Sequence, residues 1–138
     1  RKALETYVRG NGRVLVSGAY VASDMQLDAE RSFLSYVFKV GLGGQNKNIS
    51  TNLVNGLGIN FDIIRRPNDR HYAAQSVDII NPLAPAFCAM RYADGTDAAV
   101  AYDGADHKAF IMGFPMECIN NVRSRQQVMK AVMTFLAK

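Results

Sequence analysis

Cysteine and histidine are scarce in this sequence, with two of each among 138 residues. Cys88 and Cys118 do not have the CxxC spacing of common metal sites, and each lies in an apolar, strand-like segment. A free cysteine in such a segment usually behaves as a small buried hydrophobe. His71 and His107 lie in polar, turn-like segments, which favours surface histidines without a catalytic partner.

Motifs that hold metals or phosphates are also lacking. Asp103, Asp106 and His107 come nearest to a set of metal ligands, but their loop has neither the length nor the spacing of an EF-hand. The glycines of residues 41–58 match neither GxGxxG nor a P-loop. We therefore expect no cofactor and no metal.

Long apolar runs and a basic stripe are absent as well. No run approaches the roughly 20 residues of a membrane span, and no signal peptide is recognisable. The net charge is +4, yet the densest basic cluster, Arg65, Arg66 and Arg70, is interleaved with Asp62 and Asp69. We interpret it as a solvated loop and expect no nucleic-acid partner.

The hydrophobic periodicity that is present predicts an α/β chain. Helices are expected over 2–9, over 28–40, and from a cap at Asn120 or Asn121 through Ala137. Strands are expected over 13–17, 59–64, 86–92, 98–102 and 109–114, and residues 77–80 form a short apolar segment. Residues 41–58, rich in glycine and asparagine, and the polar residues 65–72 are expected to be loops.

The order of these elements indicates a mixed sheet. Asp94-Gly95 is a strong hairpin signal, and the strand over 109–114 extends this hairpin into a three-stranded meander near the C-terminus. The apolar runs 13–17 and 109–114 favour central parallel strands. A doubly wound sheet normally has more such strands. We therefore expect residues 1–138 to be one partial domain, the C-terminal portion of a larger α/β domain.

Polar residues at the ends of the two apolar strands form a candidate ligand site, since open α/β folds build sites there. These residues are Ser17, Gly18, Tyr20, Ser23, Asp24 and Glu117. Tyr20 could stack on a sugar face and Asp24 could accept hydroxyl hydrogen bonds, whereas Glu117 is the candidate catalytic residue. In the alternative interpretation, Ser23 or Asp24 caps the next helix and Glu117 stabilises a helix start.

Two motifs carry a family resemblance. Residues 7–24 contain a helix, a glycine stop, a strand and Ser-Gly-x-Tyr-x-x-Ser-Asp, and residues 109–119 contain a strand followed by Gly-Phe-Pro-x-Glu-x-Ile. The chain thereby resembles the class I glutamine-amidotransferase-like domain of exported Bacteroidetes proteins labelled xanthan lyase. The resemblance implies a flavodoxin-like three-layer sandwich, with a mixed sheet flanked by helices, and an exported location.

The resemblance also implies which chemistry is missing. Amidotransferases of this superfamily use a Cys-His-Glu triad, with the cysteine on a sharp turn after a strand and a later His-Pro-Glu motif. Here the turn after Val16 begins with Ser17 and holds no cysteine, and the later motif has Phe114 at the histidine position, with Glu117 displaced by one residue. A thiolate needs a base, and the base needs an orienting group.

The function that follows is a non-catalytic accessory or ligand-binding domain of an exported multidomain protein linked to polysaccharide or cell-wall processing. Its expected partners are other domains of the same polypeptide and carbohydrate. One alternative is a hydrolase or polysaccharide lyase whose site is completed by residues outside this segment. Another is a homo-oligomerisation module, since a truncated sheet exposes an edge that must be covered.

Overall fold

The computed structural model describes residues 6–7, 10, 12–20, 23–24, 27–47, 52–65 and 76–137. Its helical elements are α2 (Asp28–Phe33), the π-helix η1 (Leu34–Phe38), the 3-10 turn η2 (Met116–Cys118) and α3 (Val122–Ala137). Its strands are β1 (Arg13–Ser17), β2 (Val40–Asn46), β3 (Leu53–Gly56), β4 (Ile59–Asp62), β5 (Val77–Pro82), β6 (Phe87–Tyr92), β7 (Asp97–Asp103) and β8 (Lys108–Met112).

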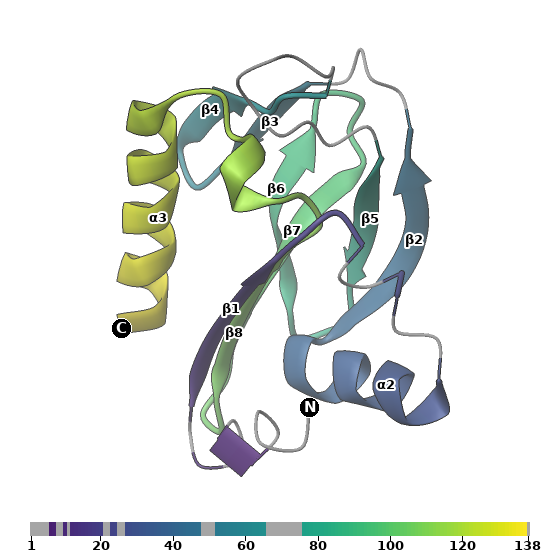
Figure 1. Cartoon of the computed structure of the whole chain (residues 1–138). Helices are drawn as coiled ribbons and strands as arrows, with labels where there is room; N and C mark the ends of the chain where they lie inside the picture. Colours follow the sequence, from purple (N-terminus) through teal and green to yellow (C-terminus); the bar gives the residue numbers. More distant parts are fainter. Residues whose placement is uncertain are drawn as a thin grey trace.

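The strands form two sheets, so the chain is mixed α/β as predicted (Figure 1). Six strands are ordered β1-β8-β7-β6-β3-β4, and β2 pairs with β5 in a separate antiparallel sheet. The predicted meander is confirmed, because β6, β7 and β8 pair antiparallel in succession. The parallel pairing of β1 with β8 is also confirmed, although β1 has a partner strand on only one side among the described residues.

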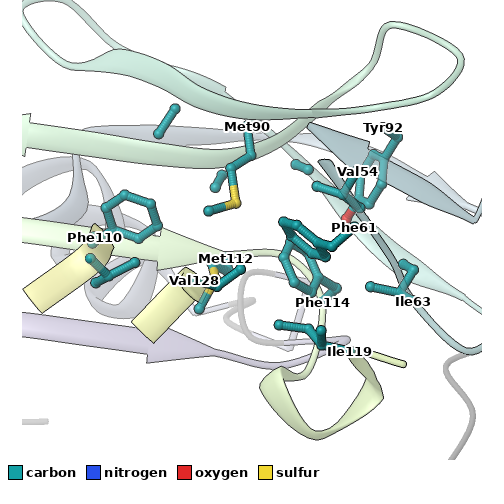
Figure 2. Close-up of a cluster of buried hydrophobic side chains, with 14 of the residues drawn as sticks. Val54, Phe61, Ile63, Met90, Tyr92, Phe110, Met112, Phe114, Ile119 and Val128 are labelled. Carbon is teal, nitrogen blue, oxygen red and sulfur yellow. The ribbon is translucent and has the colours of Figure 1, made fainter. Parts of the chain in front are cut away.

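The strand β8 is apolar from Ala109 to Met112 because it is buried on both faces. Phe110 and Met112 face a core that includes Val128 and Val132 of α3 (Figure 2). Ala109 and Ile111 belong to a second core, formed with residues of α2, η1, β2, β5 and β7. Alternate residues of one strand thus enter different cores, which explains the continuous apolar run that marked this segment in the sequence.

The prediction of a loop over residues 41–58 was wrong, because the segment contains most of β2 and all of β3. The backbone of β2 pairs with β5, and β3 pairs with both β4 and β6. A register shift lies between Leu42 and Gln45, and there Gly44 has φ +98°. Pairing with distant strands has overridden the low strand propensity of glycine and asparagine.

The helix boundaries match the sequence patterns in part. The helix predicted over 28–40 ends early, since η1 follows α2 and Lys39 adopts the left-handed conformation with φ 56°. The final helix is confirmed, and the Asn121 side chain accepts a 2.7 Å hydrogen bond from the Ser124 amide at its start. Of the helix predicted over 2–9, the structure describes only residues 6–7, which are helical.

Two residues predicted to be solvated are buried. His107 is 1% exposed, and its Nε2 lies 2.8 Å from the carbonyl oxygen of Val37 in η1. That oxygen can only accept, so Nε2 carries the proton in this contact. Arg65 is 2% exposed and its Nη2 donates to the Asn46 carbonyl oxygen at 2.7 Å. His71, Arg66 and Arg70 lie outside the described residues.

Burial of these two side chains has the same physical reason. Each supplies a donor to a carbonyl oxygen in a distant element, and a buried carbonyl needs such a partner. Burial also lowers the pKa of the Arg65 guanidinium, while Tyr92 and Asp94 act in the opposite direction. These two polar residues, which were predicted to lie in solvated loops, therefore act as internal hydrogen-bond donors.

Candidate functional site

The carboxyl end of β1 lies beside the segment that follows β8. The Ser17 hydroxyl accepts a 3.3 Å hydrogen bond from the Met116 amide, and the Gly18 amide donates to the Met112 carbonyl oxygen at 3.3 Å. Glu117, the next residue of η2, is exposed. The topology thus brings Ser17 and Gly18 to the same end of the sheet as Glu117, since β1 and β8 run parallel (Figure 1).

A tight turn holds the other candidate residues. The Asp24 amide donates to the Tyr20 carbonyl oxygen at 2.9 Å, and the Ser23 hydroxyl lies 3.5 Å from the same oxygen. The Tyr20 side chain is 48% exposed and Asp24 is exposed. An exposed tyrosine and an exposed carboxylate are therefore available to a ligand at this turn.

The alternative role of Ser23 or Asp24 as the cap of the next helix is wrong. Helix α2 begins at Asp28, beyond the reach of Ser23 or Asp24, and the amide of its N-cap residue Leu27 donates to Glu30 at 3.2 Å. Glu117 lies in the first turn of the three-residue 3-10 helix η2, five positions before α3 begins, so its alternative role as a helix-start carboxylate is compatible with the structure.

A buried carboxylate that the sequence analysis missed supports this turn. Asp78 in β5 is fully buried, and its Oδ2 accepts a 3.2 Å hydrogen bond from the Ser23 amide. The Gln45 amide group donates to Asp78 Oδ1 and, at 3.2 Å, to the Ser23 hydroxyl. Ser76 donates to the other end of the Gln45 side chain. One acidic residue inside the apolar strand Val77–Pro82 was the available signal.

The backbone of Asp78 also contacts the end of β8. Its amide donates to the Gly113 carbonyl oxygen at 2.8 Å, and a Cβ on Gly113 would lie 2.3 Å from the Asp78 carbonyl oxygen. Tyr92 donates to that same carbonyl oxygen at 2.8 Å. Glycine at position 113 thus permits the close approach that joins β5 to the Gly-Phe-Pro segment.

The positions that the resemblance assigns to the triad carry no nucleophile-base pair. Phe114 is fully buried, with its ring 5.8 Å from that of Phe61 and 6.3 Å from that of Tyr92, between ring centroids (Figure 2). Ser17 is hydrogen-bonded to backbone only, among the contacts of the described residues. An aromatic hydrocarbon cannot accept the proton of a hydroxyl or a thiol.

Among the described residues, neither Cys88 nor Cys118 is part of a disulfide, and neither is placed as a reactive thiol. Cys118 is fully buried. Burial and the neighbouring Asp97 carboxylate, 3.3 Å from the sulfur, raise the pKa of Cys88 to about 11. Cys88 is therefore a protonated thiol near neutral pH and a poor nucleophile. Within the described ranges no three histidine, cysteine or acidic side chains gather as a metal site.

A groove of about 760 Å³ lies away from these residues, between α3 and the β3–β4 hairpin. Leu57, Ile59 and Asn60 line one side, and residues of α3 including Lys130 and Phe135 line the other. None of the residues predicted from the sequence contributes to it. The first strand and the tip of this hairpin had been expected to be a loop, although a strand was expected over 59–64. The sequence patterns therefore held no signal for a groove formed by packing of the hairpin against a helix.

The buried Tyr92 side chain should make the stability of the protein depend on pH in the alkaline range. It is 1% exposed, and burial raises its pKa well above the ordinary value near 10. Above about pH 10 the unfolded chain loses the phenolic proton while the folded chain keeps it, so stability falls as pH rises. We expect Tyr92→Phe to be less stable near pH 8 by about 0.5–1.5 kcal/mol, the contribution of one hydrogen bond.

The same variant should lose stability less steeply than wild type between pH 10 and 11. Urea unfolding at pH 8, 10 and 11 measures both quantities. Parallel slopes for the two proteins would contradict the assignment of this alkaline sensitivity to Tyr92.

Comparisons with known proteins identify the fold. No family model matches the chain, and no curated protein matches it significantly. Gan42B, a GH42 β-galactosidase from G. stearothermophilus, is similar in structure, with a TM-score of 0.66 and 13% identity over 96% of this chain and 19% of that chain.

Two further solved structures share the fold. The β-galactosidase of Halorubrum lacusprofundi has a TM-score of 0.64 and 13% identity, covering 99% of this chain and 20% of its own. The exo-β-1,4-mannosidase Op5Man5 of an Opitutaceae bacterium has a TM-score of 0.58 and 12% identity, covering 99% and 22%. No helix of the described ranges is long and apolar enough to span a membrane. This chain thus has the fold of one segment of these glycosidases, and it spans about one fifth of their length.

Proposed function

We propose that this chain is a non-catalytic accessory domain of a larger carbohydrate-processing protein. The observation that carries the proposal is the identity of the side chains at the end of β1 and after β8. Ser17 carries a hydroxyl instead of the cysteine thiol of the resembling family. The fully buried Phe114 lies where that family has its histidine base. An amidotransferase-like framework without these groups can bind and position, but it has no means of opening an amide.

The link to carbohydrate rests on two independent supports. The motifs over 7–24 and 109–119 resemble the amidotransferase-like domain of exported Bacteroidetes proteins, and the fold resembles segments of glycosidases that act on galactosides and mannosides. We further propose that the parent domain is flavodoxin-like, that the parent protein is exported, and that its other domains are the main partners of this chain.

The exposed residues at the β1 turn give the accessory domain a place for a ligand. Tyr20 presents an aromatic ring, Asp24 a carboxylate, and Glu117 a second carboxylate from the adjoining turn η2. The Asp78 network holds the backbone of this turn against the second sheet. Such a rim suits hydroxyl groups and a sugar face.

The test combines a reaction assay and a binding assay on the 138-residue chain. Ammonia release from glutamine and hydrolysis of aryl β-galactoside and β-mannoside are expected to equal the buffer control. Retardation of the chain in native gels that contain an acidic polysaccharide is expected. Activity that is present in the wild-type chain and disappears in Glu117→Gln or Tyr20→Phe would overturn the non-catalytic role. Lack of retardation on any polysaccharide would overturn the link to carbohydrate.

A further inference from the structure

The groove between α3 and the β3–β4 hairpin has the dimensions of a ligand site. Its volume of about 760 Å³ falls within the roughly 300–1,000 Å³ typical of small-molecule sites. The groove lies where α3 passes beside the β3–β4 hairpin, and both elements contribute to its lining (Figure 1). Leu57, at the hairpin tip, has positive φ (53°) and stays 37% exposed at the margin of the groove.

Helix α3 separates a core face from a groove face. Val128, Val132 and Leu136 are buried in the core. Gln127, Lys130, Ala131 and Thr134 recur at helical spacing on the side that lines the groove, and the polar ones are exposed. A helix stripe meant to pack against the hairpin would be apolar. Polar residues here keep the groove open to solvent and give it hydrogen-bonding capacity.

The polar groups of the groove are available to a ligand. In the described part of the chain, the side chains of Asn60, Gln127 and Lys130 are engaged in no hydrogen bond or ion pair. They stand on opposite sides of the groove, with Asn60 on β4 and the other two on α3. Phe135, Leu57 and Ile59 add apolar surface between them. A saccharide alternates polar groups with C–H surface. The amide, ammonium and apolar groups of this lining complement that alternation.

The charge of the groove has one sign. Lys130 is the single charged residue among the nine described residues that line it. The described helix α3 carries Arg123, Arg125 and Lys130 and no acidic residue. A phosphate would favour several cations, and this lining offers one. One ammonium flanked by two carboxamides instead suits a carboxylate surrounded by hydroxyl groups.

We propose that this groove binds a short segment of a uronic-acid-containing saccharide, with Lys130 pairing its carboxylate and Asn60 and Gln127 pairing its hydroxyls. The inference rests on the proposed carbohydrate function and locates a second binding surface, distinct from the turn of Tyr20 and Asp24. A chain with two such surfaces on different elements can hold a polymer at two points, which raises avidity.

The experiment is an NMR or calorimetric titration of the 138-residue chain with tetragalacturonate, and with neutral β-1,4-galactotetraose for comparison. Lys130→Gln should weaken tetragalacturonate binding about tenfold, in line with loss of one charged hydrogen bond, and should leave the weaker binding of the neutral sugar unchanged. Thr134→Trp, which fills the groove from an exposed helix position, should weaken both. Arg123→Gln removes the same charge from the same helix outside the lining residues and should bind as wild type does.

Unchanged affinity in Lys130→Gln and Thr134→Trp, with both variants shown to be folded by circular dichroism, would overturn the groove assignment. If wild type still binds the polysaccharide gel in that case, the proposed function survives and only the location is wrong. Equal affinity for the charged and the neutral tetrasaccharide would overturn the role of Lys130. Absence of both tetrasaccharide binding and gel retardation would overturn the saccharide ligand itself.

Discussion

Phe114→Ala is expected to lower the free energy of unfolding by about 3–5 kcal/mol, the usual cost of removing a buried phenylalanine. The ring is fully buried and packs against Phe61 and Tyr92, so truncation leaves a cavity lined by side chains from β4 and β6 as well (Figure 2). Urea unfolding monitored by circular dichroism measures the loss. A chain of this size cannot spare more than a few kcal/mol, so the variant should be close to unfolding at 37 °C.

Two further variants give the control for Phe114. Phe114→Leu fills most of the same space and should cost clearly less than the alanine variant. Phe87→Ala removes an identical side chain that is 46% exposed and should also cost less. If Phe114→Ala were as stable as Phe87→Ala, the buried position of Phe114 would be wrong, and with it the reason that position 114 has no place for a base.

Asp78→Ala is expected to cost about 1–3 kcal/mol, the usual cost of leaving a buried polar group without its hydrogen bond. The variant removes the Asp78 acceptor of the Ser23 amide and one of the three acceptors of the Gln45 side-chain amide, which also donates to the Ala19 carbonyl oxygen and the Ser23 hydroxyl. We also expect faster hydrogen exchange at the Ser23 amide, since that bond ties the β1 turn to β5. Unfolding by urea and amide exchange by NMR measure the two effects.

The matched control for Asp78 lies in the same turn. Asp24→Ala removes an exposed carboxylate and should change stability by less than about 0.5 kcal/mol, as is usual for surface positions. Asp78→Asn retains one oxygen acceptor and should fall between the two. Equal stability of the Asp78→Ala and Asp24→Ala variants would show that the carboxylate of Asp78 does not hold the turn.

Sequence patterns were sufficient where a pattern reflects local chemistry. Asp94-Gly95 predicted the hairpin because a tight turn requires those residue types. The unbroken apolar run at β8 predicted a strand buried on both faces, and the Asn121 cap marked the start of α3. That positions 17 and 114 hold a serine and a phenylalanine, neither of them a thiol or an imidazole, is likewise visible in the sequence alone.

Long-range pairing settled the rest of the fold. The glycine- and asparagine-rich segment became β2 and β3 because β5 and β6 offered it hydrogen-bond partners, which no local propensity records. His107 and Arg65 are buried because their side chains donate hydrogen bonds to backbone carbonyl oxygens that are distant in sequence. The Asp78 network and the groove beside α3 arise from residues that are distant in sequence, so each depends on tertiary packing rather than on any neighbouring motif.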